Sequence, residues 1–385
     1  MKSYLLKYFK GDPVIWAVIL LLSVYSLLAV YSSTGTLAYK YQGGNTLYYL
    51  LKHASMIFFG IALILVTHRI HYKYYSVFAP ILLVCAVFLL ILTIFKGVTV
   101  NEASRWLTIP GIGLRFQTSD FAKLALIMFI ARTLSRKQEN EQDSKRSFYV
   151  LVASILTVCV LVGKENLSTA ILIFITSLVI LFVGRVKAKY LLGFIGISIV
   201  AMILAGLIIT SMPEKGRFGT WSNRIENFFN NEEGDGNYQS EQSKIAISTG
   251  GFFGKLPGNS TQKNYLPYAY SDFIFAIIIE EYGLIFGAIP LLFLYLFLLY
   301  RTGVILRKST RTFPAYLAMG ITISIVFQAL INMAVAVNIL PVTGQTLPLV
   351  SMGGTSIIIT CISIGIVLNI SRISQNNKDG FTTEE

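Results

Sequence analysis

Long apolar segments alternate along the chain with short stretches in which charged residues, glycines and prolines gather. The apolar segments are mostly roughly 18–25 residues long, the length that an α-helix needs to cross a bilayer. The pattern therefore predicts about ten membrane-spanning helices. Their expected ranges are Pro13–Ser33, Thr46–Thr67, Tyr74–Phe95, Gln117–Leu134, Phe148–Gly163, Ser168–Gly184, Tyr190–Ser211, Asp272–Tyr300, Pro314–Val337 and Gly353–Ile370.

The composition agrees with a membrane protein and argues against a soluble domain. Of the 385 residues, 54% are hydrophobic and 13% are charged, whereas soluble domains carry about 25% charged residues. We therefore predict an all-α polytopic membrane protein. The basic N-terminus leads into a first helix that we expect to be retained, because the apolar run from Pro13 is long and no clean small-residue cleavage site follows it.

The charged residues of the connections define the expected orientation. Connections on the two sides of the membrane alternate along the chain. On one side every connection is basic, and this side also holds both termini, so we place it in the cytoplasm. The net charge of +13 is then explained by topology, without a nucleic-acid partner. We expect one membrane domain, 1–374, and a disordered cytoplasmic tail, 375–385. The basic residues of the cytoplasmic set are Lys2, Lys7, Lys10, Arg69, Lys73, Arg136, Lys137, Lys145, Arg146, Arg185, Lys187, Lys189, Arg301, Arg307, Lys308, Arg311 and Arg372.

The opposite, extracytoplasmic face carries most of the unusual polar residues. Its largest connection is the loop Met212–Ser271, which precedes the eighth predicted helix. Another connection, Asn338–Met352, contains two prolines and ends at the paired Gly353 and Gly354. Irregular backbone at membrane depth is tolerated where it is buried in protein or lines a wet cavity, so we expect Asn338–Met352 to dip into the protein.

Asp272 lies where a polar loop enters the eighth apolar run. Acids in or against lipid are costly and are therefore functional candidates. Two interpretations stay open: an N-cap or first-turn acid that complements the helix dipole, or a general base at the outer membrane surface. In a helix that starts at Asp272, Glu280 would lie roughly 12 Å deeper and Glu281 would point to the opposite side. We expect Glu281 to be structural, either protonated or paired with a Lys or Arg, and leave Glu280 open.

Cations on the extracytoplasmic side run against the positive-inside bias and need an explanation. An anionic lipid head group would supply one, because charge-assisted bonds to phosphate are strong. Lys123 follows Asp120 by three residues on one helix face, where it either forms an internal ion pair or presents its ammonium to a phosphate. The other candidates are Arg105, which precedes Trp106, and Arg224 and Lys263.

No common cofactor or catalytic signature is present. The chain has no Walker loop, Rossmann fingerprint or Ser-His-Asp motif, so an activated substrate would have to bring its own leaving group. Cys85, Cys159 and Cys361 lie in apolar runs without CxxC spacing, which argues against a disulfide framework or a cysteine metal site. Assistance by a divalent cation, magnesium or manganese, stays open.

Several short motifs are spread over nearly the whole membrane region. They are Arg105-Trp106, Gln117 to Lys123, Gly258-Asn259-Ser260-x-Gln262-Lys263, Tyr265-Leu266-Pro267, Asp272-Phe273-Ile274-Phe275-Ala276, Glu280-Glu281-x-Gly283 and Leu340-Pro341-x-x-Gly344-x-x-Leu347-Pro348-x-x-Ser351-x-Gly353-Gly354. Together they resemble the SEDS proteins (shape, elongation, division and sporulation), the lipid II polymerases typified by RodA and FtsW. The Gly-Asn-Ser-x-Gln-Lys form is more similar to the division branch than to the elongation branch.

The resemblance implies an inverting glycosyl transfer at the outer face of the inner membrane, during cell division at the septum. Asp272 would deprotonate the acceptor hydroxyl, and undecaprenyl pyrophosphate would leave the donor lipid II. The implied partners are a class B penicillin-binding protein, other divisome proteins and membrane lipids. Pyrophosphate would be bound by Arg105, Lys123, Arg224 and Lys263, with supporting roles for Trp106, Asp120, Gln262, Glu280, Glu281, Ser351, Gly353 and Gly354.

The chain departs from the family pattern at several places, none of which changes Asp272. Thr118-Ser119-Asp120 replaces Pro-Ser-Glu, Tyr268 replaces an acid, and Lys164–Thr169 replaces Gln-Pro-Asp-x-Gly-Thr. These departures leave the secondary acids, including any metal ligand, unassigned. Two other functions stay open. A lipid II flippase would need polar access from both leaflets, and a divisome scaffold without chemistry would not need Asp272.

Overall fold

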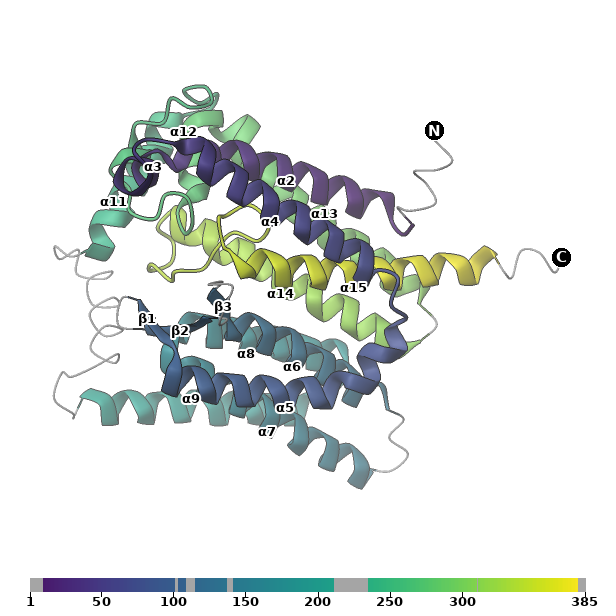
Figure 1. The fold of residues 1–385 in the computed structure, drawn as a ribbon. Coiled ribbons are helices and arrows are strands. Elements are labelled where there is room, and N and C mark those ends of the chain that lie inside the picture. Colours follow the sequence, from purple (N-terminus) through teal and green to yellow (C-terminus); the bar gives the residue numbers. More distant parts are fainter. Residues whose placement is uncertain are drawn as a thin grey trace. The chain divides into compact units, whose positions relative to one another are not determined.

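The computed structural model describes residues 10–100, 103–108, 115–136, 141–210, 235–309 and 311–379 (Figure 1). Helices make up most of this length, and seven of the described helices are long and apolar enough to cross a membrane. Two further apolar helices among the described residues are shorter. The polytopic helical architecture expected from the sequence is confirmed, and the larger expected number of spans is compatible with these helices.

The chain divides into two compact units, which are described one at a time. Unit 1 comprises Met1–Tyr72, Asn227–Thr310 and Ile321–Glu385, and unit 2 comprises Lys73–Glu226 and Arg311–Gly320. The elements that lie mainly in unit 1 are α2 (Pro13–Ser33), α3 (Gly35–Gln42), α4 (Thr46–Thr67), α11 (Asp235–Gly250), η1 (Gln262–Asn264), α12 (Ile274–Gly283), η2 (Leu284–Ala288), α13 (Ile289–Lys308), α14 (Thr312–Ala336) and α15 (Thr355–Asp379). Those of unit 2 are α5 (Tyr72–Lys96), β1 (Val98–Val100), β2 (Ala103–Thr108), β3 (Arg115–Gln117), α6 (Thr118–Ser135), α7 (Glu141–Glu165), α8 (Leu167–Val183) and α9 (Ala188–Thr210).

Helix α2 runs antiparallel to α13, and polar contacts join α2 and its N-cap residue to α13 and to the preceding turn η2. The sequence sets the start of α2, because the Asp12 carboxylate accepts a hydrogen bond from the N–H of Val14 (2.9 Å) and a proline follows Asp12 at the first helical position. At the same end, Arg301 forms an ion pair with the buried Asp12 (Nη2 to Oδ2, 2.5 Å). Farther along α2, the Tyr25 hydroxyl donates to the carbonyl of Phe286 (2.6 Å).

The predicted eighth span, Asp272–Tyr300, is divided into α12 and α13, with a π-helical turn between them. The division occurs at Gly283, which has a φ of 74°. A Cβ at Gly283 would lie 2.3 Å from the carbonyl oxygen of Phe252, so only glycine fits this close approach. The N–H of the next residue, Leu284, also has a partner in the segment before α12, because it donates to the carbonyl of Gly251 (3.0 Å). The eighth predicted span is thus present as one apolar helical stretch, Ile274–Arg307, but it begins at Ile274 and its regular α-helical geometry is interrupted at Gly283.

The segment Asn338–Met352 dips into unit 1, as its prolines and glycines predict. Residues 347–351 are buried, and no α-helix or strand forms within the segment. Its carbonyl groups receive hydrogen bonds from side chains of three helices, which is how buried irregular backbone is stabilised. The donor–acceptor pairs are Gln328 to Thr346 (3.0 Å), Tyr295 to Pro348 (2.5 Å) and Ser26 to Val350 (2.8 Å).

In unit 2, an arginine of α6 compensates for a proline inside α5. Pro80 has no N–H, so the carbonyl of Ser76 loses its donor within the helix. Arg132 donates from Nη1 to the carbonyls of Ser76 (2.5 Å) and Val77 (2.8 Å). These bonds join α5 to α6 at the point where the proline leaves backbone acceptors available.

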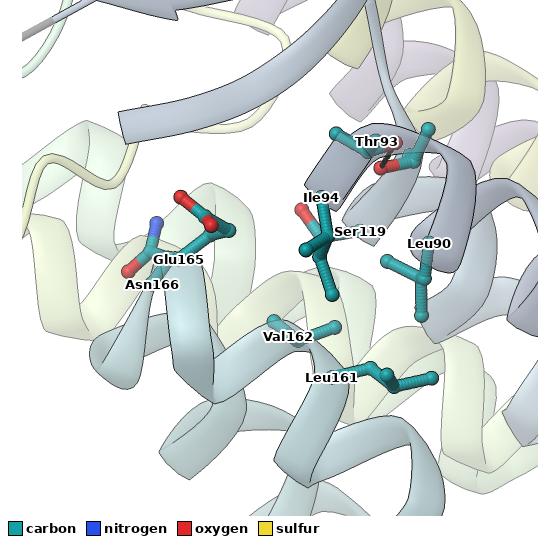
Figure 2. Close-up of a pocket in the computed structure, with 9 residues that line it drawn as sticks. Leu90, Thr93, Ile94, Ser119, Leu161, Val162, Glu165 and Asn166 are labelled. Carbon is teal, nitrogen blue, oxygen red and sulfur yellow. Dashed lines mark hydrogen bonds between the residues drawn. The ribbon is translucent and has the colours of Figure 1, made fainter. Parts of the chain in front are cut away.

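A small cavity lies where α5, α6 and α7 approach the start of α8 (Figure 2). Its volume of about 20 Å³ is enough for one water molecule. One side is formed by Glu165 and Asn166, and the Asn166 side chain caps α8 by accepting a hydrogen bond from the Thr169 N–H (3.2 Å). On another side, the Thr93 hydroxyl donates to the hydroxyl of Thr118 (3.0 Å). The stretch Lys164–Thr169, which departs from the Gln-Pro-Asp pattern, thus ends α7 and begins α8.

Regular structure also occurs in two expected loops and in the expected tail. The loop Met212–Ser271 contains α11 and η1, and the connection 96–116 forms an antiparallel sheet with the order β1-β2-β3. Helix α15 continues to Asp379, into the segment 375–385 that was expected to be disordered. Neither α11 nor the end of α15 has the apolar composition that would have marked it as a helix, because both sequences are largely polar.

Candidate functional site

Asp272 lies in unit 1, in a turn directly before α12. Helix α12 begins at Ile274 and its N-cap position is Phe273, with no side-chain capping bond and no acid in the first turn. The N-cap interpretation of Asp272 is therefore wrong. The Asp272 carboxylate does not close the end of α12.

Three consecutive carbonyl groups fix the backbone of this turn. The carbonyls of residues 270–272 each accept a hydrogen bond from the buried segment or from α14. The donors are the N–H of Met352 to residue 270 (3.0 Å), the hydroxyl of Ser351 to residue 271 (2.6 Å) and the amide of Asn332 to residue 272 (2.8 Å). Asn332 also donates to the carbonyl of Gln345 (2.7 Å), which ties α14, the buried segment and the Asp272 turn together.

The Asp272 side chain is half-buried, and its Oδ1 accepts a hydrogen bond from the hydroxyl of Ser271 (2.8 Å). A neighbouring phenol, Tyr270, has a pKa above its usual value, because the side chain is partly buried and because the phenol of Tyr268 and the carboxylate of Asp272 disfavour a further negative charge. Tyr270 therefore remains protonated beside Asp272. A fixed backbone with a partly exposed carboxylate is an arrangement suited to a general base.

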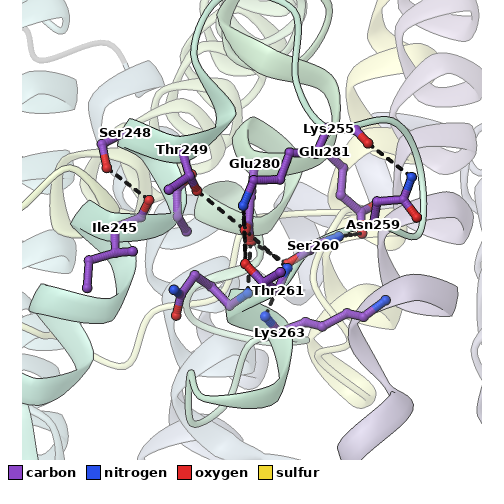
Figure 3. Close-up of polar contacts among 12 residues, drawn as sticks. Ile245, Ser248, Thr249, Lys255, Asn259, Ser260, Thr261, Lys263, Glu280 and Glu281 are labelled. Carbon is purple, nitrogen blue, oxygen red and sulfur yellow. Dashed lines mark hydrogen bonds and ion pairs between the residues drawn. The ribbon is translucent and has the colours of Figure 1, made fainter.

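A second group of polar side chains surrounds Glu280, toward the far end of α12 (Figure 3). We call it the Glu280 cluster, and it comprises Thr249, Lys255, Ser260–Gln262, Glu280 and Glu281. Both glutamates are almost fully buried. Glu280 forms an ion pair with Lys255 (Oε1 to Nζ, 2.7 Å). Its other donors are the Ser260 hydroxyl, the Thr261 N–H (3.1 Å) and hydroxyl (2.8 Å), the Gln262 N–H (3.2 Å) and the Thr249 hydroxyl (3.4 Å).

Glu281 connects the same cluster to α2. Its Oε1 accepts hydrogen bonds from the Ser32 hydroxyl and from the Ser260 N–H (3.3 Å). Lys263 lies beside these groups and donates to the Ser32 hydroxyl (3.4 Å) and to the carbonyl of Gly258 (2.6 Å). Among the described residues, a cationic partner is thus present for Glu280, which the sequence had left open, whereas Glu281, for which protonation or pairing with Lys or Arg was expected, contacts a hydroxyl and a backbone amide.

The Glu280 cluster holds α12 against the chain that precedes it. The Lys255 N–H donates to the carbonyl of Glu280 (2.9 Å). A Cβ added at Gly250 would lie only 2.3 Å from the carbonyl oxygen of Ile279, so α11 meets α12 at backbone contact. Because the two glutamates share Ser260 as a partner, they act as one group, which the helix wheel drawn from Asp272 did not predict.

The remaining sequence candidates lie mostly in unit 2. Asp120 and Lys123 form an ion pair on α6 (3.8 Å) with little exposure of either side chain, as the internal-pair interpretation predicts. Trp106 lies in β2 opposite Gln117 of β3, and Arg105 precedes it in the same strand. Arg224 lies outside the described residues. The structure therefore places Lys263 in the same unit as Asp272, and the other two described candidate cations, Arg105 and Lys123, in unit 2.

Comparison with known proteins identifies the family to which the chain belongs. Residues 12–376 match the model of the FtsW/RodA/SpoVE family, which is described as "Cell cycle protein". The chain belongs to this family. The resemblance to SEDS proteins is thereby confirmed over residues 12–376.

Curated relatives in the FtsW/RodA/SpoVE family are similar over most of their length. One from Trichlorobacter lovleyi, named "Probable peptidoglycan glycosyltransferase FtsW", is 33% identical. The aligned region covers 94% of this chain and 93% of the relative's length. Another with the same name, from Legionella pneumophila, is 34% identical, and the aligned region covers 91% of this chain and 88% of that relative's length.

Solved structures share the fold. A chain from a peptidoglycan synthase complex described for its coordination of polymerization and crosslinking superposes with a TM-score of 0.72 at 23% identity, covering 94% of this chain and 98% of that chain. The rod shape determining protein RodA of Thermus thermophilus superposes with a TM-score of 0.68 at 22% identity, covering 95% of this chain and 98% of that one. At these identities the likeness concerns the fold alone.

The structure adds supporting residues that the sequence did not single out. Lys255 and Asn332 are the main ones, since the first neutralises Glu280 and the second holds the Asp272 turn. Of the predicted supporting residues, Ser351 contacts that turn, and Gly353 and Gly354 end the buried segment just before α15. No group of three His, Cys, Asp or Glu side chains converges in the described part of the chain, and we assign no metal ligand.

Proposed function

We propose that this chain is a peptidoglycan glycosyltransferase that polymerises lipid II into glycan strands at the outer face of the cytoplasmic membrane during cell division. The observation that carries the proposal is the placement of Asp272, a half-buried carboxylate on a turn whose three carbonyls are all hydrogen-bonded. The name shared by the curated relatives, peptidoglycan glycosyltransferase FtsW, supports the substrate class and the division role.

In this proposal Asp272 acts as the general base of an inverting transfer. The carboxylate takes the proton of the acceptor sugar hydroxyl while that oxygen attacks the anomeric carbon of the donor. The bond from the anomeric carbon to the pyrophosphate oxygen breaks, and undecaprenyl pyrophosphate leaves with the electron pair. General-base assistance of this kind contributes about 10²–10⁴-fold in rate. The fixed turn serves this step because the base must stay within hydrogen-bonding distance of the acceptor hydroxyl.

The pyrophosphate requires cations, and Lys263 is the described candidate in the same unit as Asp272. Its ammonium group already contacts two oxygen atoms, those of Ser32 and Gly258, which hold it in a defined position. Arg105, Lys123 and Arg224 are further candidates for pyrophosphate binding. An ammonium or guanidinium that meets a leaving pyrophosphate stabilises the charge that develops on it.

A class B penicillin-binding protein is the proposed partner, in the inner membrane at the septum. The related solved structure from a peptidoglycan synthase complex, described for polymerization and crosslinking, supports a transpeptidase partner. Crosslinking of new strands beside the enzyme that makes them is a chemical reason for such a pairing.

The test is polymerisation of labelled lipid II by the purified chain with its partner, comparing wild type with Asp272→Asn. We expect long strands from the wild type and none from the variant, which keeps the size and shape of the side chain. Equal product from both would remove Asp272 as the base. If the competent wild-type complex makes no strands, movement of labelled lipid II across vesicle membranes will separate a flippase from a scaffold.

A further inference from the structure

A second, larger cavity lies within unit 2, away from the residues assigned above. Its volume is about 300 Å³, which is the lower end of the range of small-molecule sites. It is lined by the end of α6, the first half of α7, the connection from α8 to α9 and the first turn of α9. The described lining residues are Leu134, Arg136, Phe148, Leu151, Gly184, Arg185, Val186, Lys187 and Tyr190.

The polar part of the lining is cationic. Arg136 comes from the end of α6, whereas Arg185 and Lys187 come from the α8–α9 connection, so the charges converge from separate parts of the chain. The described lining residues include no acid, and in the described part of the chain neither arginine forms an ion pair. All three cations belong to the connections that the positive-inside rule places in the cytoplasm. A cavity with this charge is suited to an anion.

The backbone at Arg185 gives a second indication of a binding role. Arg185 has a φ of 56°, in the left-handed region that favours glycine. It closes α8, because its N–H donates to the carbonyl of Phe182 (3.0 Å) and the next N–H, of Val186, donates to that of Leu181 (3.2 Å). This helix end normally carries glycine at the left-handed position. The positive-inside rule explains a cation somewhere in this connection but not one at the strained position that faces the cavity.

The remaining lining is apolar and aromatic. Phe148 and Tyr190 lie with their ring centroids 5.3 Å apart, and Leu151 is buried beside them. Cations at the edge of the membrane, next to an apolar and aromatic lining, are suited to bind a phosphate group that carries an apolar substituent. We propose that this cavity binds a phosphate group through Arg136, Arg185 and Lys187. The phosphate is supplied by an anionic phospholipid of the cytoplasmic leaflet or by soluble phosphate.

The test measures binding by the full chain, purified and delipidated in neutral detergent. Dioctanoyl phosphatidylglycerol, dioctanoyl phosphatidylcholine and inorganic phosphate are titrated separately, and occupancy is followed by native mass spectrometry and by thermal stability. The variants are Arg136→Gln and Arg185→Gly. The matched control is Lys189→Gln, which removes one exposed cation from the same end of unit 2 without touching the cavity.

We expect saturable binding that each arginine variant weakens about tenfold, while the control leaves it unchanged. Arg185→Gly also separates binding from folding, since glycine relieves the backbone strain and the variant should be at least as stable as the wild type. Saturation by phosphatidylglycerol alone identifies a phospholipid site, and saturation by inorganic phosphate identifies a soluble ligand. The proposal is overturned if no probe saturates, or if both arginine variants bind with the same affinity as the wild type. Lipid II polymerisation is not the readout, so the outcome is independent of the role of Asp272.

Discussion

The pair formed by Lys255 and Glu280 offers the sharpest test of the structure. Lys255→Met removes the ammonium group and keeps a side chain of similar length. It also keeps the bond from the residue 255 N–H to the carbonyl of Glu280, which belongs to the backbone. The substitution therefore removes the 2.7 Å ion pair with Glu280 and the hydrogen bond from the Lys255 ammonium to the Thr261 hydroxyl (3.1 Å).

The expected loss of stability follows from the surroundings of the two side chains. Breaking a buried ion pair by removing one partner costs about 3–5 kcal/mol. Here the Lys255 side chain is 29% exposed, and Glu280 keeps its donors from Ser260, Thr261 and Gln262. Both features reduce the cost, and we expect Lys255→Met to destabilise the protein by about 1–3 kcal/mol.

The assay is a double-mutant cycle on unfolding in mixed detergent micelles, with Glu280→Gln as the second substitution. Once Glu280→Gln has removed the carboxylate charge, loss of the Lys255 ammonium should cost less, which gives a coupling energy of about 1–2 kcal/mol. Lys244→Met is the control, because Lys244 is an exposed cation of α11. Coupling below about 0.5 kcal/mol, the usual limit of additivity, or equal losses from Lys255→Met and Lys244→Met, would refute a structural role for the pair.

Three further predictions concern backbone contact, the Asp272 turn and phosphate binding. Gly250→Ala places a Cβ 2.3 Å from a backbone oxygen of α12 and should destabilise the fold by about 1–3 kcal/mol in the same unfolding assay, whereas Gly196→Ala, in open space, should not. Asn332→Leu leaves two buried carbonyls without their donor and should lower lipid II turnover about tenfold or more while lipid II affinity is retained. Lys123→Met should weaken lipid II binding about tenfold if its ammonium binds phosphate, and unchanged binding and turnover would limit Lys123 to its pair with Asp120.

The membrane helices were predictable because their physics is local. Apolar length alone located α2 and α4 at their observed ends, and the prolines and glycines of Asn338–Met352 marked a buried irregular segment. The break at Gly283 was not predictable in this way. It depends on a backbone approach from Phe252, which is remote from the apolar pattern that surrounds the glycine.

The residues of the candidate site likewise fall into those that the local sequence predicts and those that only the fold reveals. Asp272 and Glu280 stand out in the sequence because charge in or next to an apolar run is conspicuous, and Lys263 was a candidate as a cation on the extracytoplasmic side. Lys255 and Asn332 do not, since a lysine in a polar loop and an asparagine in a helix are ordinary residues until their partners are known. Their importance arises from contacts across 25 and 60 residues of sequence, which only the fold brings together.

The two sets of contacts lie at opposite ends of a buried helix of ten residues. At its start, Asn332 and Ser351 fix the turn that carries Asp272, and toward its end the Glu280 cluster fixes the helix itself. A helix of this length is about 15 Å long and transmits displacement as a rigid element. The cluster therefore acts on Asp272 only through the position of α12, whereas Asn332 acts on its backbone directly. Substitution in the cluster should consequently lower stability more than turnover, and substitution at Asn332 should do the reverse.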